Sequence, residues 1–146
     1  MDIEISDVGH MIQLAIAPVF LLTGVGTMLV VLTNRLARII DRTRVVEARM
    51  REEGEHPDCV AELRSLYRRA GLINVAIAAN SLCALLVCLV IAMLFLADST
   101  NLPFDRYIAV CFVLAMAALT ASFVYFLREV FVGSRYLRAQ QLRALR

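Results

Sequence analysis

Three long runs of uncharged, mostly apolar residues constrain this chain more than any other feature of its sequence. They cover residues 12–32, 70–97 and 107–127, and none of them contains Asp, Glu, Lys, Arg or His. A helix needs about 20 residues to cross a hydrocarbon core of roughly 30 Å, so each run is long enough to span a membrane. The sequence therefore predicts an all-α integral membrane protein with three transmembrane helices.

The overall composition supports this class. Apolar residues make up 60% of the 146-residue chain, whereas soluble domains contain about 45–50%. The residues before the first run carry Asp2, Glu4 and Asp7, while a cleaved signal peptide begins with positive charge. We therefore expect the first run to be retained as a membrane span.

The arginines are distributed unevenly around the three runs. Nine of the fifteen lie in residues 33–69, five lie in residues 128–146, and one lies in the loop at residues 98–106. Loops rich in arginine stay on the cytoplasmic side of a membrane, because moving them across the bilayer is costly. We expect the N-terminus to lie outside and the C-terminal tail, residues 128–146, to be cytoplasmic.

Helical periodicity continues beyond the first run. Apolar residues at alternating steps of four and three, a heptad pattern, predict that the first helix extends into the cytosol: Leu32, Leu36, Ile39, Thr43, Val46 and Met50. Residues 54–57 then break the helix, and Asp58 can cap a return helix. Its expected seam is Val60, Leu63, Tyr67, Ala70 and Asn74. Residues 33–69 thus predict a cytoplasmic antiparallel helical hairpin within a single membrane domain, residues 1–146.

Three strings in the chain resemble a known family. They are AIAPVFLLTGVG at residues 15–26, LTNRLARIIDR at residues 32–42 and RRAGLINVAI at residues 68–77. They are similar to small bacterial inner-membrane proteins grouped as a domain of unknown function. The resemblance implies a multi-pass, three-span protein of the bacterial inner (cytoplasmic) membrane, and it transfers no catalytic or binding residue.

A row of arginines follows the first run. Arg35, Arg38, Arg42 and Arg49 are spaced by three, four and seven residues, so they share one helix face. Next to a membrane, each cation can contribute about 1 kcal/mol to binding anionic lipid headgroups. The face can also bind a cytosolic protein. The alternative is that these arginines are simply solvated and serve only to keep this segment on the cytoplasmic side of the membrane.

The second run carries a stripe of small side chains. Ala76, Asn80, Ala84, Cys88 and Ala92 recur at every fourth position, and Ala115, Ala118 and Ser122 offer a matching face in the third run. Small residues let helix backbones approach closely, and an intramembrane Asn can form a hydrogen bond across the contact. The stripe predicts a packing face toward the other spans or toward another subunit, and we expect a homo-oligomer.

The remaining polar residues of the spans suggest an alternative function. Gln13, Thr23, Thr27 and Asn80 can line a pore between subunits, although the TGVGT segment at residues 23–27 is expected to be helical rather than a selectivity filter. A proton or ion pump is disfavoured, because such proteins usually place an ionisable residue within a span.

Catalytic or metal-binding chemistry has little support in the sequence. His56 and Cys59 flank the helix break without a third orienting group. Glu4, Asp7 and His10 are spaced by three residues and, with Asp98 and Asp105, offer an oxygen-rich cation site at the outer ends, but the sequence fixes no geometry for these acids. We expect no enzyme activity, cofactor, metal or nucleic acid. The sequence favours a membrane-anchored scaffold or interaction module, with an oligomeric channel for ions or small solutes as the alternative.

Overall fold

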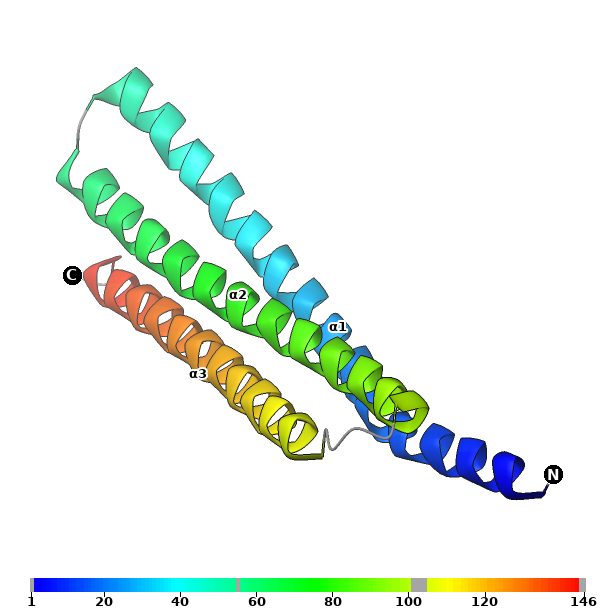
Figure 1. Ribbon diagram of the computed structural model, residues 1–146. Coiled ribbons are helices and arrows are strands. Elements are labelled where there is room, and N and C mark those ends of the chain that lie inside the picture. The colour runs from blue at the N-terminus through cyan, green and yellow to red at the C-terminus, as the bar shows by residue number, and fades with distance from the viewer. Residues whose placement is uncertain (1, 55, 101–104, 145–146) are drawn as a thin grey trace. The chain divides into compact units, whose positions relative to one another are not determined.

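The structure, a computed structural model, describes the backbone of residues 2–54, 56–100 and 105–144. Side chains are described for residues 9, 12, 13, 15–52, 54, 56–96 and 106–134. The described backbone forms three helices, α1 (Asp2–Glu53), α2 (Pro57–Thr100) and α3 (Asp105–Ala144), and it contains no strand (Figure 1). Each helix includes a segment long and apolar enough to cross a membrane. The predicted class, an all-α membrane protein with three spans, is confirmed.

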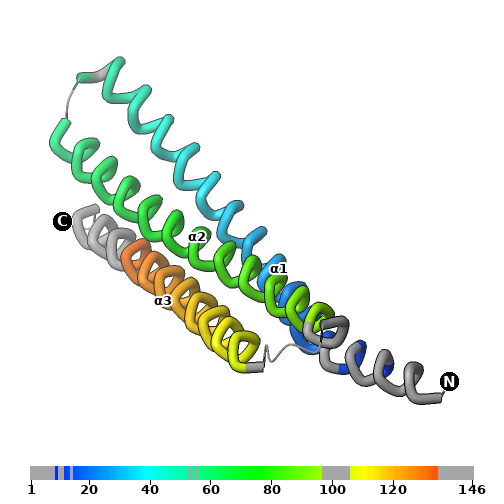
Figure 2. The backbone as a smooth tube through the Cα atoms, in the orientation of Figure 1, coloured from blue at the N-terminus to red at the C-terminus, as the bar shows by residue number. Residues whose placement is uncertain are grey.

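Contacts divide the chain into two compact units. Unit 1 consists of Met1–Leu29 and Ala79–Thr120, and unit 2 consists of Val30–Ala78 and Ala121–Arg146. All three helices contribute to both units, and Figure 2 shows that α1 and α2 continue as helix through these divisions.

The break between α1 and α2 falls where the sequence predicts it. Gly54 has a φ of 85°, a left-handed conformation that glycine adopts without steric cost. Pro57 is the first residue of α2, a position where its missing N–H is no loss. The carbonyl of His56 accepts hydrogen bonds from the N–H groups of Cys59 (3.0 Å) and Val60 (3.2 Å). Asp58, which was predicted to cap this helix, lies within its first turn, where a negative charge interacts favourably with the helix N-terminus.

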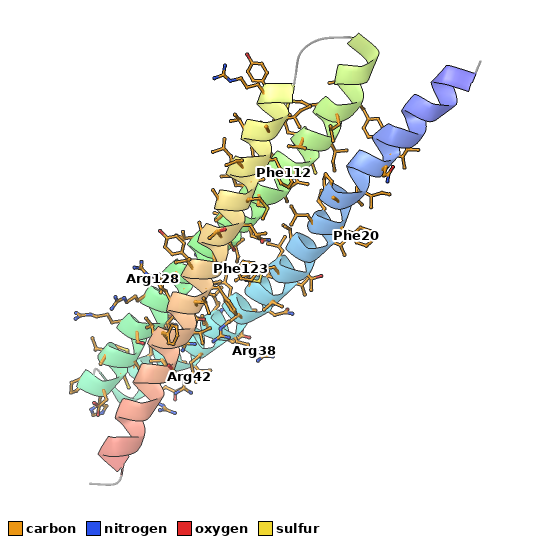
Figure 3. All side chains as sticks on the ribbon, turned by 90° about the horizontal axis from the view of Figure 1, so that it is seen from below. Phe20, Arg38, Arg42, Phe112, Phe123 and Arg128 are labelled. Atoms are coloured by element: carbon orange, nitrogen blue, oxygen red, sulfur yellow. The ribbon has the colours of Figure 1, made fainter. Side chains whose placement is uncertain are left out.

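Unit 1 has a small apolar core. Val25 of α1, Cys83 and Val87 of α2, and Ala115 of α3 are buried together, and Leu22 and Ala118 are among the side chains packed against them. The outer surface is also apolar, with Phe20 of α1 exposed by 74% (Figure 3). An apolar exterior around a modest core is what a lipid-facing helix bundle requires, because lipid tails replace water around it.

In unit 2, α1 packs as the heptad pattern predicts. Leu32, Ile39 and Val46 are buried, and Leu36, Thr43 and Met50 are half-buried.

The seam predicted for the return helix is only partly right: Leu63 and Ala70 are half-buried, whereas Val60, Tyr67 and Asn74 are exposed. Tyr67 is 56% exposed and Asn74 is also exposed, whereas Leu66 and Ile73, one residue earlier, are buried. One residue turns a helix by about 100°, so this shift moves the packed face well to one side. Leu66 and Ile73 carry no polar side-chain atoms, so burying them leaves no amide or hydroxyl without a hydrogen-bond partner.

All three helices bury residues at heptad spacing. On α1 the buried residues seven apart are Pro18, Val25, Leu32, Ile39 and Val46. On α2 two such series interleave, Leu66, Ile73, Asn80 and Val87 with Ala76, Cys83 and Val90. On α3 the series is Ala115, Ser122 and Glu129. A mean step of 3.5 residues is the period of coiled-coil packing, so the polar members of these series occupy core positions.

Candidate functional site

The predicted stripe on α2 divides into a buried part and an exposed part. Ala76 and Asn80 are fully buried, Ala84 is half-buried, and Cys88 and Ala92 are exposed. Every fourth residue advances by about 40° beyond a full turn, so a stripe of period four rotates away from the core. The residues that continue the packed face are Cys83, Val87 and Val90 instead.

Two buried polar side chains form hydrogen bonds to backbone carbonyls of a neighbouring helix. In unit 1, Asn80 Nδ2 donates a hydrogen bond of 2.9 Å to the carbonyl of Val25, and its Oδ1 has no hydrogen-bond partner among the described residues. In unit 2, Ser122 Oγ donates to the carbonyl of Ala76 at 2.8 Å. Both groups are buried, so these bonds remove most of the penalty of placing polar atoms in an apolar environment.

Three of the four polar residues proposed for a pore lie outside the core of unit 1, whereas the fourth, Asn80, is fully buried. Gln13, Thr23 and Thr27 are all exposed. Thr27 Oγ1 donates to the carbonyl of Thr23 at 3.0 Å, and Thr23 Oγ1 lies 3.4 Å from the carbonyl of Val19, both within α1. A pore lined by these residues would therefore form between copies of the chain.

A cluster of three charged residues, one from each helix, lies in unit 2, and we call it the ion cluster. Glu129 of α3 is fully buried between Arg35 of α1 and Arg69 of α2. Oε1 accepts a hydrogen bond of 2.8 Å from Nε of Arg69 and also forms an ion pair of 2.8 Å with Nη2 of the same side chain. Oε2 lies 2.6 Å from Nε of Arg35. This contact is an ion pair and does not have the geometry of a hydrogen bond. Each carboxylate oxygen therefore faces a different guanidinium.

Neighbouring residues hold the two arginines in place. A Cβ at Gly133 of α3 would lie 3.1 Å from Cζ of Arg69, so glycine lets this guanidinium pack closely against α3. The guanidinium carbon of Arg35 lies 5.4 Å from the ring centroid of Phe126, within the range of a cation–π interaction. The packing of α3 thus orients both partners of its own carboxylate.

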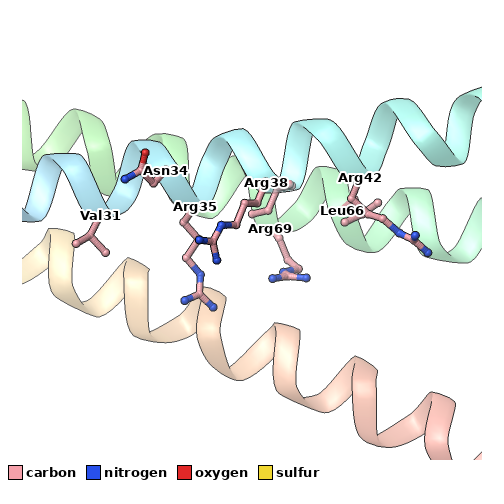
Figure 4. Close-up of a pocket in the computed structure, with 8 residues that line it drawn as sticks. Val31, Asn34, Arg35, Arg38, Arg42, Leu66 and Arg69 are labelled. Atoms are coloured by element: carbon pink, nitrogen blue, oxygen red, sulfur yellow. The ribbon is translucent and has the colours of Figure 1, made fainter.

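Three members of the predicted arginine row line a cavity in unit 2. The cavity has a volume of about 510 Å³, and Arg35, Arg38 and Arg42 of α1 form one wall while Arg69 of α2 contributes to another. Figure 4 shows the guanidinium groups of Arg35 and Arg38 next to one another, with Arg42 further along α1. Arg49 is exposed and does not line this cavity.

Two polar contacts connect α1 to α2 within unit 2, between the part of α1 that begins at Val30 and the part of α2 that ends at Ala78, which we call the arms. Arg42 forms an ion pair of 2.7 Å with Glu62, and the Tyr67 hydroxyl donates to Glu47 Oε1 at 2.7 Å. The two arginine side chains nearest the end of the first run, Arg35 and Arg38, have no such carboxylate on α2 among the described residues.

Sequence reasoning missed Glu129 and Arg69 as site residues. Two signals indicate them in retrospect. Glu129 is the only acidic residue after Asp105, within a segment that carries five arginines from residue 128 onward. It also lies seven residues after Ser122 and fourteen after Ala115, which places it on the packed face of α3.

The residues considered for catalysis or metal binding form no site in the described part of the chain. His56 is exposed and Cys59 is half-buried. The side chains of Glu4, Asp7, His10, Asp98 and Asp105 lie outside the described residues. Among those described, no group of three or more His, Cys, Asp and Glu side chains could hold a metal ion.

A family model described as a protein of unknown function (DUF2721) matches residues 15–139. The chain belongs to the DUF2721 family. The DUF2721 match includes the apolar segments of all three helices, the ion cluster and the arginine-lined cavity. The resemblance noted in the sequence is thereby confirmed. No curated protein and no solved structure matches the chain.

Proposed function

We propose that this DUF2721 protein is a membrane-anchored scaffold or interaction module of the bacterial inner membrane. The observation that carries the proposal is the burial of Glu129 between arginines of the two other helices. A carboxylate held in this way resists separation, because removing either partner leaves a poorly solvated charge. Such a cluster favours a fixed assembly of helices over a gate or a transport cycle.

In this proposal the arms of α1 and α2 lie in the cytosol and present their outer face to a protein partner. The arginine excess of residues 33–69 supports the cytosolic location through the positive-inside rule. The outer face carries exposed charged residues, among them Arg44, Arg49 and Glu52. The binding face would therefore be charged and mixed in sign, which suits a cytosolic protein and excludes lipid tails.

Topology is the first premise to test. A reporter that is active only in the cytoplasm, fused after Arg146, is expected to be active, and the same reporter inserted in the loop at residues 98–106 is expected to be silent. The opposite pattern would place the charged arms outside the cell and overturn the cytosolic role.

The scaffold role is tested by photo-crosslinking in cells. A photoreactive residue at Arg49 is expected to yield adducts with a discrete cytosolic protein, whereas one at Phe20, which lies in the apolar part of α1, is not. Both positions are exposed, so burial does not bias the comparison. Adducts at Arg49 that contain only this chain or lipid would contradict the scaffold proposal.

We further propose that the chain is a homo-oligomer that associates through α2. Cys88 and Ala92 are small and exposed, so a second helix can approach there closely. Cross-linking of membranes with a short bis-maleimide is expected to give a species of twice the chain mass, and Cys88→Ala is expected to abolish it. Cys111, which is half-buried on α3, provides the control substitution Cys111→Ala. A monomer under all conditions would refute the association.

An oligomeric channel for ions or small solutes is the second candidate. It is favoured by Gln13, Thr23 and Thr27, which lie within about 80° of one another around α1 and face away from the unit 1 core. Purified protein in liposomes would then release a trapped ion or dye, and Thr23→Val with Thr27→Val would change the rate. A scaffold leaves the liposomes sealed.

A further inference from the structure

We propose that the arginine-lined cavity of unit 2 binds the phosphate of an anionic phospholipid headgroup. Arg35, Arg38, Arg42 and Arg69 line this cavity of about 510 Å³, and the Asn34 amide adds a further hydrogen-bonding group. Arginine donates N–H groups in a planar fork that matches the oxygens of a phosphate. Basic pockets of this kind beside transmembrane helices are typical sites for anionic lipid headgroups.

The charges in the cavity do not balance. The four arginines carry +4, and the carboxylates paired with them, Glu62 and Glu129, carry −2, which leaves +2. Arg38 makes no ion pair with any described residue, although it lies beside Arg35 (Figure 4). Clustered guanidinium groups repel one another, and an anion between them converts the repulsion into attraction. A phosphodiester brings one negative charge and a phosphomonoester brings up to two.

The site is organised before a ligand arrives. Glu129 contacts Nε of Arg35 and both Nε and Nη2 of Arg69. A guanidinium carries five N–H groups, so each arginine has more donors than these contacts use. Gly133 and Phe126 restrict the same two side chains. Because these arginines are already ordered, a ligand loses less affinity to side-chain ordering than it would on a flexible surface.

The position of the cavity along the chain favours a lipid over a soluble anion. Arg35 follows the end of the first apolar run, residues 12–32, by three residues, or about 4.5 Å of helix. Arg69 directly precedes the second run, residues 70–97. Both arginines therefore fall at headgroup depth. The apolar side chains of Val31, Ile39 and Leu66 also line the cavity and suit the glycerol and first acyl carbons of a lipid.

The test compares two variants of the full chain in mild detergent. Arg38→Gln removes a cavity arginine that no described carboxylate needs, and Arg49→Gln removes an exposed arginine of the same helix outside the cavity. Native mass spectrometry would measure binding of added phosphatidylglycerol, with phosphatidylcholine as the zwitterionic probe. We expect wild type and Arg49→Gln to retain phosphatidylglycerol equally and in preference to phosphatidylcholine. Arg38→Gln is expected to bind it about fivefold more weakly.

Three results would overturn the proposal. Equal retention by Arg38→Gln and Arg49→Gln would show that the cavity does not hold the headgroup. Equal binding of phosphatidylglycerol and phosphatidylcholine would exclude charge recognition. Displacement of phosphatidylglycerol by millimolar inorganic phosphate from wild type, and not from Arg38→Gln, would assign the cavity to a soluble phosphate compound instead. The free energy of unfolding of Arg38→Gln in detergent is measured as a control. If it equals that of wild type, weaker lipid binding does not result from a loss of fold.

Discussion

Unit 1 and unit 2 are built from the same three helices and the same heptad spacing, yet they place different chemistry at the packed positions. In unit 1 the only fully buried polar side chain among the described residues is Asn80, among Val25, Cys83 and Ala115. In unit 2 the equivalent faces carry Glu129 with its partner Arg69. A neutral amide costs little in an apolar core once it donates a hydrogen bond, whereas a buried carboxylate requires cationic partners.

The difference follows from the position of each residue relative to the apolar runs. Asn80 lies ten residues after the start of the second run, residues 70–97, while Glu129 lies two residues after the end of the third. Its arginine partners are 36% and 23% exposed, so they can bring charge to a buried acid while staying partly solvated. The comparison teaches that one helical repeat can serve both environments if charge is confined to the ends of the spans.

Replacing Glu129 is expected to have the largest effect on stability. Glu129→Gln keeps the side-chain volume but leaves Arg35 and Arg69 without an anion, and breaking a buried pair in this way costs roughly 3 to 5 kcal/mol. The measurement is the free energy of unfolding in a detergent titration followed by circular dichroism. Glu52→Gln, an exposed acid on α1, is the control and should change it by less than about 0.5 kcal/mol. Equal effects of the two would remove the distinction between the units.

Next in size is the disruption of the packed face on the arm of α2. Leu66→Asp places a charge at a buried position and should lower the free energy of unfolding by roughly 3 kcal/mol. Val60→Asp makes the same kind of change at a residue that is 40% exposed, and its effect should be much smaller. A larger loss for Val60→Asp would restore the seam expected from sequence and contradict the observed phase.

The smallest effect is expected in unit 1. Asn80→Ala removes the hydrogen bond to the Val25 carbonyl, and such intramembrane bonds contribute about 0.6 to 2 kcal/mol. Asn74→Ala on the same helix is the matched control, because Asn74 is exposed. If Asn80→Ala destabilised the protein as strongly as Glu129→Gln, unit 1 would depend on its polar contact as much as unit 2 does.

Much of the architecture could be predicted from the sequence, because long uncharged runs, heptad steps and a Gly-Pro break are local signals. The three helices, the break at residues 54–57 and the packed face of α1 follow from them. The face of α2 could not be read in the same way. Its small residues recur at every fourth position, and that pattern competes with the heptad series through Ile73, Asn80 and Val87.

The ion cluster depends on three residues far apart in the chain. Arg35, Arg69 and Glu129 each look like a solvated flanking charge when the sequence is read locally. They come into contact only when the packed faces of all three helices are known. An error of one residue in the packed face of α2 is enough to place Arg69 away from Glu129. The arginine row was predicted as a binding face, but the alignment of Arg38 and Arg42 with Arg69 around one cavity required the packing of α1 against α2.

A double-mutant cycle between Glu129 and Arg69 tests the central claim, that a shared carboxylate holds the helices of unit 2 together. Unfolding free energies are measured for wild type, Glu129→Gln, Arg69→Gln and the double variant. Because either single change already removes the direct contact between Glu129 and Arg69, we expect the double variant to lose about 2 kcal/mol less than the two single losses added together. Losses that add to within about 0.5 kcal/mol would show that the two side chains act independently and would contradict the account.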